Sequence, residues 1–265
     1  MSGEGVTFGS LFSGVGGFDL GLEQAGMKCK WQCEINDDCR TVLERHFPNT
    51  IRFHDATKIS GVLRVDVLCG GDPCPKHSRA RSNGDSRHPD LSGHFLSLAA
   101  RLKPRWLVRE NVPASTVDHF DAALDALGYG TCIVRVDAAA FTGQSRQRDF
   151  IVGCYQATRR ELRECFAECV DGAGRYTTRL GTRQVAPALT THRTRYDSRV
   201  CFVWEDCRGL RILDREERES LAGFPEGWTS GFSEATRARM LGNSLVPACA
   251  EWIGQRIMLT QDTRP

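Results

Sequence analysis

One short segment of the chain places a reactive side chain in a loop built for exposure. The run GGDPCP at 70–75 carries Cys74 between two prolines, which stiffen the loop. A cysteine becomes a nucleophile as its thiolate, which nearby cations favour. Side chains that can be positively charged follow at positions 76, 77, 79 and 81. We therefore interpret Cys74 as a candidate nucleophile rather than as a structural cysteine in a turn.

Two further segments carry groups that can recognise a nucleobase. Glu110 and Asn111 end a predicted strand, and a carboxyl beside an amide can hydrogen-bond the Watson–Crick edge of a base. Arg146 and Arg148 occupy alternate positions of an extended segment, so both are expected to project to one side and to bind a carbonyl oxygen or a phosphate. Each of these motifs taken singly is more often a surface feature than a site, so the interpretation depends on their combination.

A glycine-rich loop near the N-terminus is a candidate cofactor site. The run FSGVGG at 12–17 follows a predicted strand and precedes a predicted helix, and its glycines let a ligand approach the backbone closely. Its spacing is not that of a phosphate-binding P-loop. Glu34 ends the next strand, where an acid can hold the ribose hydroxyls of a nucleoside cofactor. The alternatives are a tight turn and a surface carboxylate.

The segments between these motifs alternate between strand and helix patterns. This alternation, with short connections, predicts an α/β fold with a doubly wound parallel sheet and a ligand site at the carboxyl ends of its strands. The predicted strands lie at 6–13, 29–34, within 65–74, and at 105–111, 131–139 and 148–155, and the predicted helices at 18–26, 37–46, 90–103 and 115–127.

The second half of the chain has a different character. Residues 156–200 lose the alternation and are rich in Arg, Thr and Gly, which indicates a separate small region; helices are predicted again at 213–224 and 233–244. The formal net charge is only +2, but residues 76–109 hold eight basic and two acidic residues, and residues 159–199 hold nine and five. Two basic stretches around a candidate active loop favour a polyanionic substrate.

The composition excludes several classes of protein. With 40% hydrophobic and 26% charged residues over 265 positions, the chain is typical of a globular protein. Its apolar runs fall far short of the roughly 20 residues that a membrane helix needs, and the N-terminus lacks the pattern of a secretory signal. We expect no membrane association. The 12 cysteines include no CxxC pair, so we expect reduced thiols and no metal site.

The order of these motifs resembles that of the DNA (cytosine-5) methyltransferase family. The blocks are FSGVGG, CE, HDAT, GGDPC, REN, QSRQR and RMLGNSLVP, and ILDREERESLAGFPEGWT resembles the segment before the last of them. The resemblance implies a mostly parallel, Rossmann-like methyltransferase sheet with a small second domain. It divides the chain into a catalytic domain of residues 1–155 plus 233–265 and a target-recognition domain of residues 156–232.

The resemblance also assigns roles by motif position. It implies that S-adenosylmethionine is bound by Phe12, Gly14, Gly16, Gly17, Glu34, Asp55, Pro73 and Asn243. It implies that catalysis is carried out by Cys74, Glu110, Arg146 and Arg148, with Glu110 at N3 and the exocyclic amine of cytosine and the arginines near O2. It implies that DNA is contacted by Ser78, Arg79, Arg81 and Asn111. We expect a duplex from which the target base is flipped out, because C6 of a stacked base is out of reach.

Three features depart from the usual family pattern. Asp72 stands where the family more often has an apolar residue or proline, and an acid beside a thiolate disfavours its charged form unless a cation compensates. PKHS follows at 75–78, where the family commonly has Gln and then an aromatic residue before Ser. Only 29 residues lie between Gly153 and Arg183, a stretch that is usually much longer. So short a segment makes few base contacts, which predicts a short or relaxed recognition sequence.

Several alternatives stay open. The same chemistry could act on single-stranded DNA, RNA or a free cytosine nucleotide, although the basic stretches argue against the nucleotide. A non-catalytic nucleic-acid-binding relative would have no need of Cys74. A dehydrogenase-like enzyme and transfer of a larger alkyl group are further alternatives. We expect a monomer in the cytoplasm of a bacterium or phage host, and a nuclear origin stays open. The recognition sequence and any partner restriction enzyme are not readable from the sequence.

Overall fold

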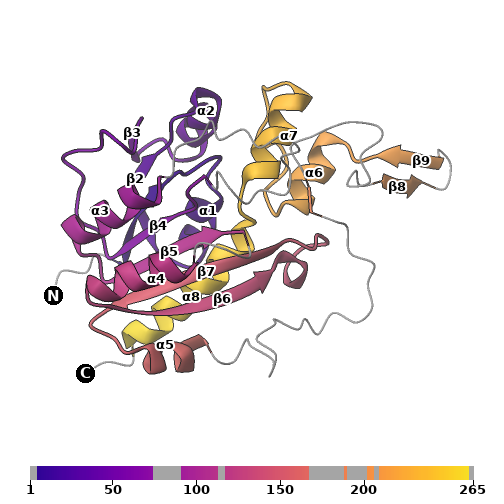
Figure 1. Cartoon of the computed structure of the whole chain (residues 1–265). Coiled ribbons are helices and arrows are strands. Elements are labelled where there is room, and N and C mark those ends of the chain that lie inside the picture. The colour runs from indigo at the N-terminus through magenta and orange to yellow at the C-terminus, as the bar shows by residue number, and fades with distance from the viewer. Residues whose placement is uncertain are drawn as a thin grey trace.

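A seven-stranded sheet with helices on both faces forms the centre of the protein (Figure 1). The computed structural model describes residues 5–73, 91–112, 117–166, 188–189, 202–205 and 209–262. In spatial order the strands are β3 (Ile51–Phe53), β2 (Lys28–Cys33), β1 (Thr7–Leu11), β4 (Val67–Gly70), β5 (Trp106–Asn111), β7 (Gln147–Tyr155) and β6 (Tyr129–Asp137). The helices are α1 (Gly17–Gln24), α2 (Asp37–His46), α3 (Ser92–Leu102), α4 (Val117–Ala126), α5 (Arg159–Phe166), α6 (Arg215–Leu221), α7 (Glu234–Asn243) and α8 (Pro247–Asp262). The predicted α/β fold is confirmed.

One strand of the sheet is reversed. Strands β3, β2, β1, β4 and β5 are parallel to one another, whereas β7 runs antiparallel to both β5 and β6. The connection from β6 to β7 holds only a short 3-10 helix, Ala138–Ala140. A parallel pair needs a crossover of about a dozen residues or more, so this connection can only form a hairpin. The sheet is therefore mostly parallel, as expected, with one antiparallel strand.

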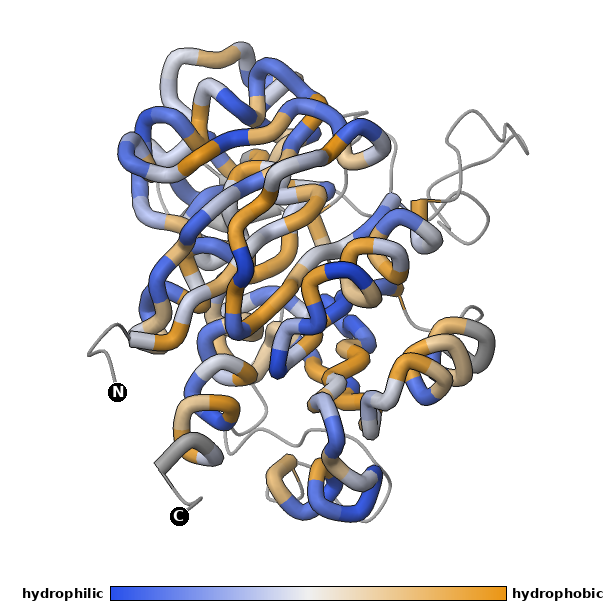
Figure 2. The backbone as a smooth tube through the Cα atoms, turned by 90° about the vertical axis from the view of Figure 1, so that its left-hand side faces the viewer, coloured by the Kyte–Doolittle hydropathy of each residue, from blue (hydrophilic) through white to orange (hydrophobic). Residues whose placement is uncertain are grey.

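The alternation of side chains along each strand gives the two faces of the sheet separate cores. On β5, Trp106 and Val108 belong to the core that α1 and α8 cover, while Leu107 belongs to the core that α3 and α4 cover. Figure 2 shows the central strands as mainly hydrophobic segments. Because both faces are covered, β1 and β4 are buried at every position, as is typical of the central strands of parallel sheets.

Helix α5 lies within the region for which no regular element was expected. Its Leu162 and Phe166 are one helical turn apart and are buried in the same core as α8. The helix is otherwise strongly polar, which hid its short apolar stripe in the sequence. Helix α5 thus packs with the sheet, although the expected domain division placed residues 156–232 together. A second sheet of β8 (Phe202–Glu205) and β9 (Gly209–Ile212) stands apart from the first (Figure 1).

Helix α8 returns to the N-terminal half of the chain and packs closely on α1. A Cβ at Gly21 would lie 2.2 Å from the carbonyl oxygen of Pro247 and 2.8 Å from the Cβ of Ala250. A Cβ at Gly254 would lie 2.7 Å from the Cβ of Ala25. Small residues on both helices therefore allow their backbones to approach closely. None of the helices in the described ranges is long and apolar enough to cross a membrane.

We expect Gly21→Ala to destabilise the protein by about 2 kcal/mol, because overpacking a tight contact typically costs 1–3 kcal/mol. The new methyl group must push α1 and α8 apart, which outweighs the better helix propensity of alanine. Gly93→Ala in α3 is the matched control, since a Cβ there meets no atom of the described residues within 4 Å. Urea unfolding of both variants tests the prediction. Equal midpoints for Gly21→Ala and the native chain would contradict the close contact.

Candidate active site

The carboxyl ends of the parallel strands meet at one edge of the sheet. The register pairs Leu11 with both Cys33 and Gly70, and Gly70 with Arg109. The loops after β1, β2, β4 and β5 therefore open at the same edge, which is where ligands bind in such sheets. The predicted residues that this edge brings together are Phe12, Gly14, Gly16, Gly17, Glu34, Asp55, Pro73, Glu110, Asn111, Arg146 and Arg148. Cys74, Ser78, Arg79 and Arg81 lie outside the described residues.

Glu34 holds the glycine-rich loop that follows β1. Its carboxylate accepts hydrogen bonds from the backbone N–H of Gly14 and of Asn36, each at 2.8 Å. Burial raises the pKa of Glu34. Gly14 has a φ of 56°, and a Cβ there would meet no atom within 4 Å in the part of the chain that the structure describes. A carboxylate beside an open, glycine-backed surface can accept hydrogen bonds from the hydroxyl groups of a sugar.

The other two predicted glycines of the loop face protein. A Cβ at Gly16 would lie 2.9 Å from the ring of Phe47, and a Cβ at Gly17 would lie 2.6 Å from the carbonyl oxygen of Leu245. Gly16 also has a φ of 89°, which disfavours any side chain. These glycines let α2 and the segment before α8 close against the loop, so the structure gives them a packing role.

Beyond Glu34, an apolar and an acidic side chain extend the same edge. Ile35 is 64% exposed directly after Glu34. Asp55 accepts hydrogen bonds from the backbone N–H (2.9 Å) and hydroxyl (2.7 Å) of Thr57, and these bonds lower the pKa of Asp55. The backbone N–H of Glu34 donates to the carbonyl of Phe53 at 3.1 Å, which keeps the two loops together. Ile35 was not among the residues predicted from the sequence, although its position directly after the strand-end acid was a usable signal.

Glu110 and Arg148 form an ion pair across β5 and β7. The Nε of Arg148 lies 2.8 Å from Oε1 of Glu110, and the two side chains are only 18% and 16% exposed. Oε2 of Glu110 would lie 2.8 Å from a Cβ at Gly71, so the carboxyl rests on the loop that leads toward Cys74. A carboxyl held by a guanidinium offers both acceptors and donors to one edge of a base.

Arg146 donates its side-chain hydrogen bonds to the backbone of other segments. Its guanidinium donates to the carbonyl oxygens of Leu189 (3.3 Å) and Gly242 (3.0 Å). The backbone N–H of Arg146 donates to the carboxylate of Asp137 at 2.7 Å. The side chain is buried, and this burial lowers its pKa to about 10. Arg146 therefore joins the start of β7 to the end of α7, where the predicted cofactor residue Asn243 is exposed.

Asp72 is buried, and a cation compensates its charge. The guanidinium of Arg109 forms two hydrogen bonds with it, from Nε to Oδ1 at 2.5 Å and from the terminal nitrogen to Oδ2 at 2.8 Å. The same guanidinium lies 4.0 Å above the ring centroid of Phe120 in α4. Asp72 departs from the family pattern, and an acid near a thiolate needs a compensating cation. Arg109 is that cation.

A buried acid lies beneath the glycine-rich loop. Asp19 in α1 is fully buried and accepts hydrogen bonds from the amide of Gln32 at 2.9 Å and the hydroxyl of Ser10 at 3.2 Å. Burial raises its pKa to about 6, and these hydrogen bonds offset only part of that effect. These hydrogen bonds join α1 to β1 and β2, and Asp19 was not among the residues predicted from the sequence.

Asp19 should make the stability of the protein depend on pH. Its folded pKa is above the unfolded value of 3.8, so the folded state binds the proton more tightly. The free energy of unfolding therefore falls as pH rises through about 4 to 6 and then stays level. We expect Asp19→Asn to remove a decline of order 2 kcal/mol between about pH 4.5 and 7.5. Urea unfolding across this range, with exposed Glu44→Gln as control, measures it; parallel curves for native and Asp19→Asn would contradict it.

The segment after α6 closes on the glycine-rich loop from outside. The indole N–H of Trp228 donates to the carbonyl of Val15 at 2.8 Å, and its ring stacks on His46 with 3.6 Å between centroids. Buried Glu219 accepts hydrogen bonds from the backbone N–H of Gly227 and Thr229, each at 2.7 Å. Burial alone raises the pKa of Glu219, but its hydrogen bonds outweigh burial and lower it. This network holds the block FPEGWT against the glycine-rich loop and α2.

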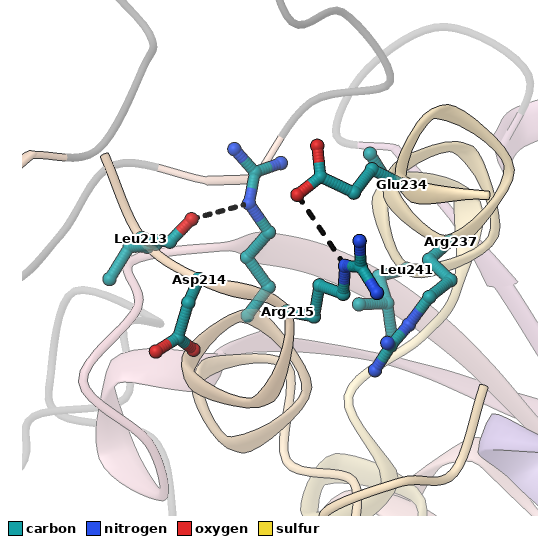
Figure 3. A pocket seen from close by; sticks show the side chains of 8 residues that line it. Leu213, Asp214, Arg215, Glu234, Arg237 and Leu241 are labelled. Atoms are coloured by element: carbon teal, nitrogen blue, oxygen red, sulfur yellow. Dashed lines mark hydrogen bonds and ion pairs between the residues drawn. The ribbon is translucent and has the colours of Figure 1, made fainter. Parts of the chain in front are cut away.

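A pocket between α6 and α7 is lined by charged residues that are already paired (Figure 3). The Nε of Arg215 lies 3.4 Å from Glu234, and the Nε of Arg218 donates to the carbonyl of Leu213 at 3.3 Å. Its lining contains none of the predicted site residues. The carboxyl edge of the sheet therefore stays the candidate active site.

The fold and this edge define a class of protein. A sheet with a reversed strand, a glycine-rich loop held by a strand-end acid, and a carboxyl–guanidinium pair across β5 and β7 are together typical of an α/β enzyme whose ligands bind at the carboxyl edge of its sheet. The sequence model of C-5 cytosine-specific DNA methylases matches residues 6–171. The chain belongs to this family, and the family resemblance predicted from its motifs is confirmed.

Two known methyltransferases and one solved structure align with most of this chain. The Type II methyltransferase M2.BsuMI of Bacillus subtilis is 26% identical over 94% of this chain and 74% of its own length. The Type II methyltransferase M.MspI of a Moraxella species is 23% identical over 97% and 71%. The solved structure of a DNMT2 mutant from Spodoptera frugiperda aligns with a TM-score of 0.72 at 15% identity, covering 96% of this chain and 99% of that one. That structure supports the fold alone.

Proposed function

We propose that this chain transfers a methyl group from S-adenosylmethionine to C5 of cytosine in duplex DNA through a covalent bond between Cys74 and C6. One observation carries the proposal. The Glu110–Arg148 pair lies against Gly71 at the same edge of the sheet where Glu34 holds the open loop at Gly14. A base-recognising pair, the approach to a nucleophile and a cofactor-type loop therefore share one edge.

The residues at this edge fit S-adenosylmethionine. The carboxylate of Glu34 suits the ribose hydroxyls, the exposed face of Ile35 suits a flat purine, and Asp55 suits its amino group. Gly14 leaves open space that a side chain would fill. When bound, S-adenosylmethionine supplies an electrophilic methyl group on a sulfonium. The proposed set also includes Phe12, Pro73 and Asn243. It includes Gly16 and Gly17 through their backbone, since the Cβ positions of both glycines face protein.

The chain's own residues account for the remaining chemistry. The thiolate of Cys74 adds to C6 of cytosine, and the electron pair of the C5–C6 double bond moves toward C5 and N3. Glu110, in its protonated form, donates to N3, and Arg148 donates to O2, so the added charge is stabilised. C5 is then nucleophilic and accepts the methyl group as its bond to the sulfonium breaks, and S-adenosylhomocysteine is the leaving group. Loss of the C5 proton to a base restores the double bond and expels the Cys74 thiolate. Arg146, bound to backbone carbonyls, would position this edge.

DNA recognition must expose the target base to the proposed site. We infer that the target base is flipped out of a duplex, because the chemistry needs access to both faces of C5–C6. Contacts to the opened strand are assigned to Ser78, Arg79, Arg81 and Asn111, and the recognition sequence is expected to be short. The two-domain division, a monomeric state and a bacterial or phage-host cytoplasm belong to the same proposal.

Methyl transfer from labelled S-adenosylmethionine tests the proposal directly. Duplex DNA, single-stranded DNA, RNA and dCMP are supplied in parallel to the native chain. We expect label in duplex DNA, recovered as 5-methylcytosine by mass spectrometry. Label confined to single strands, RNA or dCMP would assign a different substrate. Label in none of them would refute the proposed reaction. Bisulfite mapping that finds a strict four- to six-base site would contradict the short recognition sequence.

A further inference from the structure

We propose that the buried Asp72–Arg109 pair positions the loop that carries the nucleophile and keeps the charge of Asp72 from acting on it. This inference rests on the proposed function of Cys74. Asp72 precedes that residue by two positions, and Arg109 precedes Glu110 by one. The pair therefore connects the loop after β4 to the strand that bears the proposed base-binding carboxyl.

Successive residues of β5 hold successive residues of the loop. Arg109 belongs to the face of the sheet that α4 covers, since its guanidinium lies over Phe120. The next side chain of a strand points to the opposite face, and there Glu110 rests on Gly71. Strand β5 therefore contacts the loop on both faces of the sheet, at Gly71 and at Asp72. These two contacts set the direction in which the chain leaves the sheet toward Cys74.

The geometry of the pair is stronger than stability alone requires. The Asp72 and Arg109 side chains are only 3% and 2% exposed, and two parallel hydrogen bonds join them. Buried ion pairs can often be replaced by well-packed apolar residues without loss of stability. What an apolar pair cannot reproduce is the fixed direction of a two-bonded fork. We therefore assign this pair to positioning.

The second role is electrostatic. Asp72 and Cys74 are separated by one residue, so their Cα atoms are at most about 7 Å apart. A bare carboxylate at that distance disfavours a thiolate. The guanidinium of Arg109 cancels this charge at 2.5 Å. An acid in the nucleophile loop is thereby compatible with thiolate chemistry.

Three variants separate the two roles. Arg109→Met leaves Asp72 without its cation, so we expect the acidic limb of the pH–rate profile to move upward by about one unit and kcat at neutral pH to fall about tenfold. Arg109→Lys keeps the positive charge but loses the two parallel hydrogen bonds of the guanidinium. We therefore expect the acidic limb of its pH–rate profile to match that of the native chain and its kcat to be lower. Asp72→Leu combined with Arg109→Met removes both charges, so we again expect an acidic limb that matches that of the native chain, together with a lower kcat. Arg135→Met, which breaks the more exposed pair with Asp149, is the control and should leave both unchanged.

A readout besides activity keeps the inference distinct from the proposed reaction. Alkylation of Cys74 by iodoacetamide is followed by mass spectrometry against pH, with urea unfolding run on each variant. We expect the pH at which Cys74 becomes reactive toward iodoacetamide to rise in Arg109→Met alone. If the native chain methylates nothing while this shift is present, the proposed reaction fails and the electrostatic role stands. Native limbs and native kcat in all three variants, with only their stability lowered, would show that the pair is structural and overturn the inference.

Discussion

Replacing Cys74 with serine should reduce methyl transfer to background. A serine hydroxyl is a far weaker nucleophile than a thiolate near neutral pH, so addition to C6 no longer occurs. Binding of S-adenosylmethionine, measured by calorimetry, should stay within about threefold, since the bound cofactor is assigned to other side chains. Cys39→Ser is the matched control, because burial raises the pKa of Cys39 to about 12 and so keeps its thiol protonated. Undiminished transfer by Cys74→Ser would exclude the covalent route.

The same prediction has a second, covalent readout. DNA carrying 5-fluorocytosine at the target position can accept the methyl group but has no C5 proton to lose. The Cys74 adduct should then persist through denaturing electrophoresis with the native chain and be absent with Cys74→Ser. An adduct formed equally by both would place the nucleophile elsewhere.

Glu110→Gln should lower kcat by roughly 10²- to 10⁴-fold, the usual range for loss of a positioned general acid. Glutamine keeps the shape of the side chain but cannot deliver a proton to N3. It also loses the ion pair at 2.8 Å with Arg148, so the guanidinium is no longer held in place. Single-turnover methyl transfer measures the effect, and unfolding confirms that the fold persists.

Exposed Glu164→Gln, on the outer side of α5, is the control for Glu110→Gln and should behave as the native chain does. If Glu110→Gln lowered only the affinity for DNA and left kcat intact, Glu110 would be a binding residue. The proposed role in stabilising charge at N3 would then be wrong.

Local patterns in the sequence determined much of the fold. Helix α2 lies at 37–46 as predicted, because Asn36 caps it and a clear amphipathic pattern follows. The Gly loop, Glu34 and Glu110 were placed at strand ends because apolar runs stop there, and parallel strands bring such ends to one edge. These features depend on neighbours within a few residues, so spacing alone reveals them.

Other features depend on contacts between distant segments and were decided only by the tertiary structure. Arg146 and Arg148 were expected to project together, yet Arg146 precedes β7 and turns toward the carbonyls of Leu189 and Gly242, whereas Arg148 faces Glu110. Asp72 stood out in the sequence as an unexplained acid, and its partner lies 37 residues away. The sequence by itself determined which groups this protein has and at which strand ends they stand. Only the packing of the sheet decided which of them touch, because pairing across strands has no trace in local spacing.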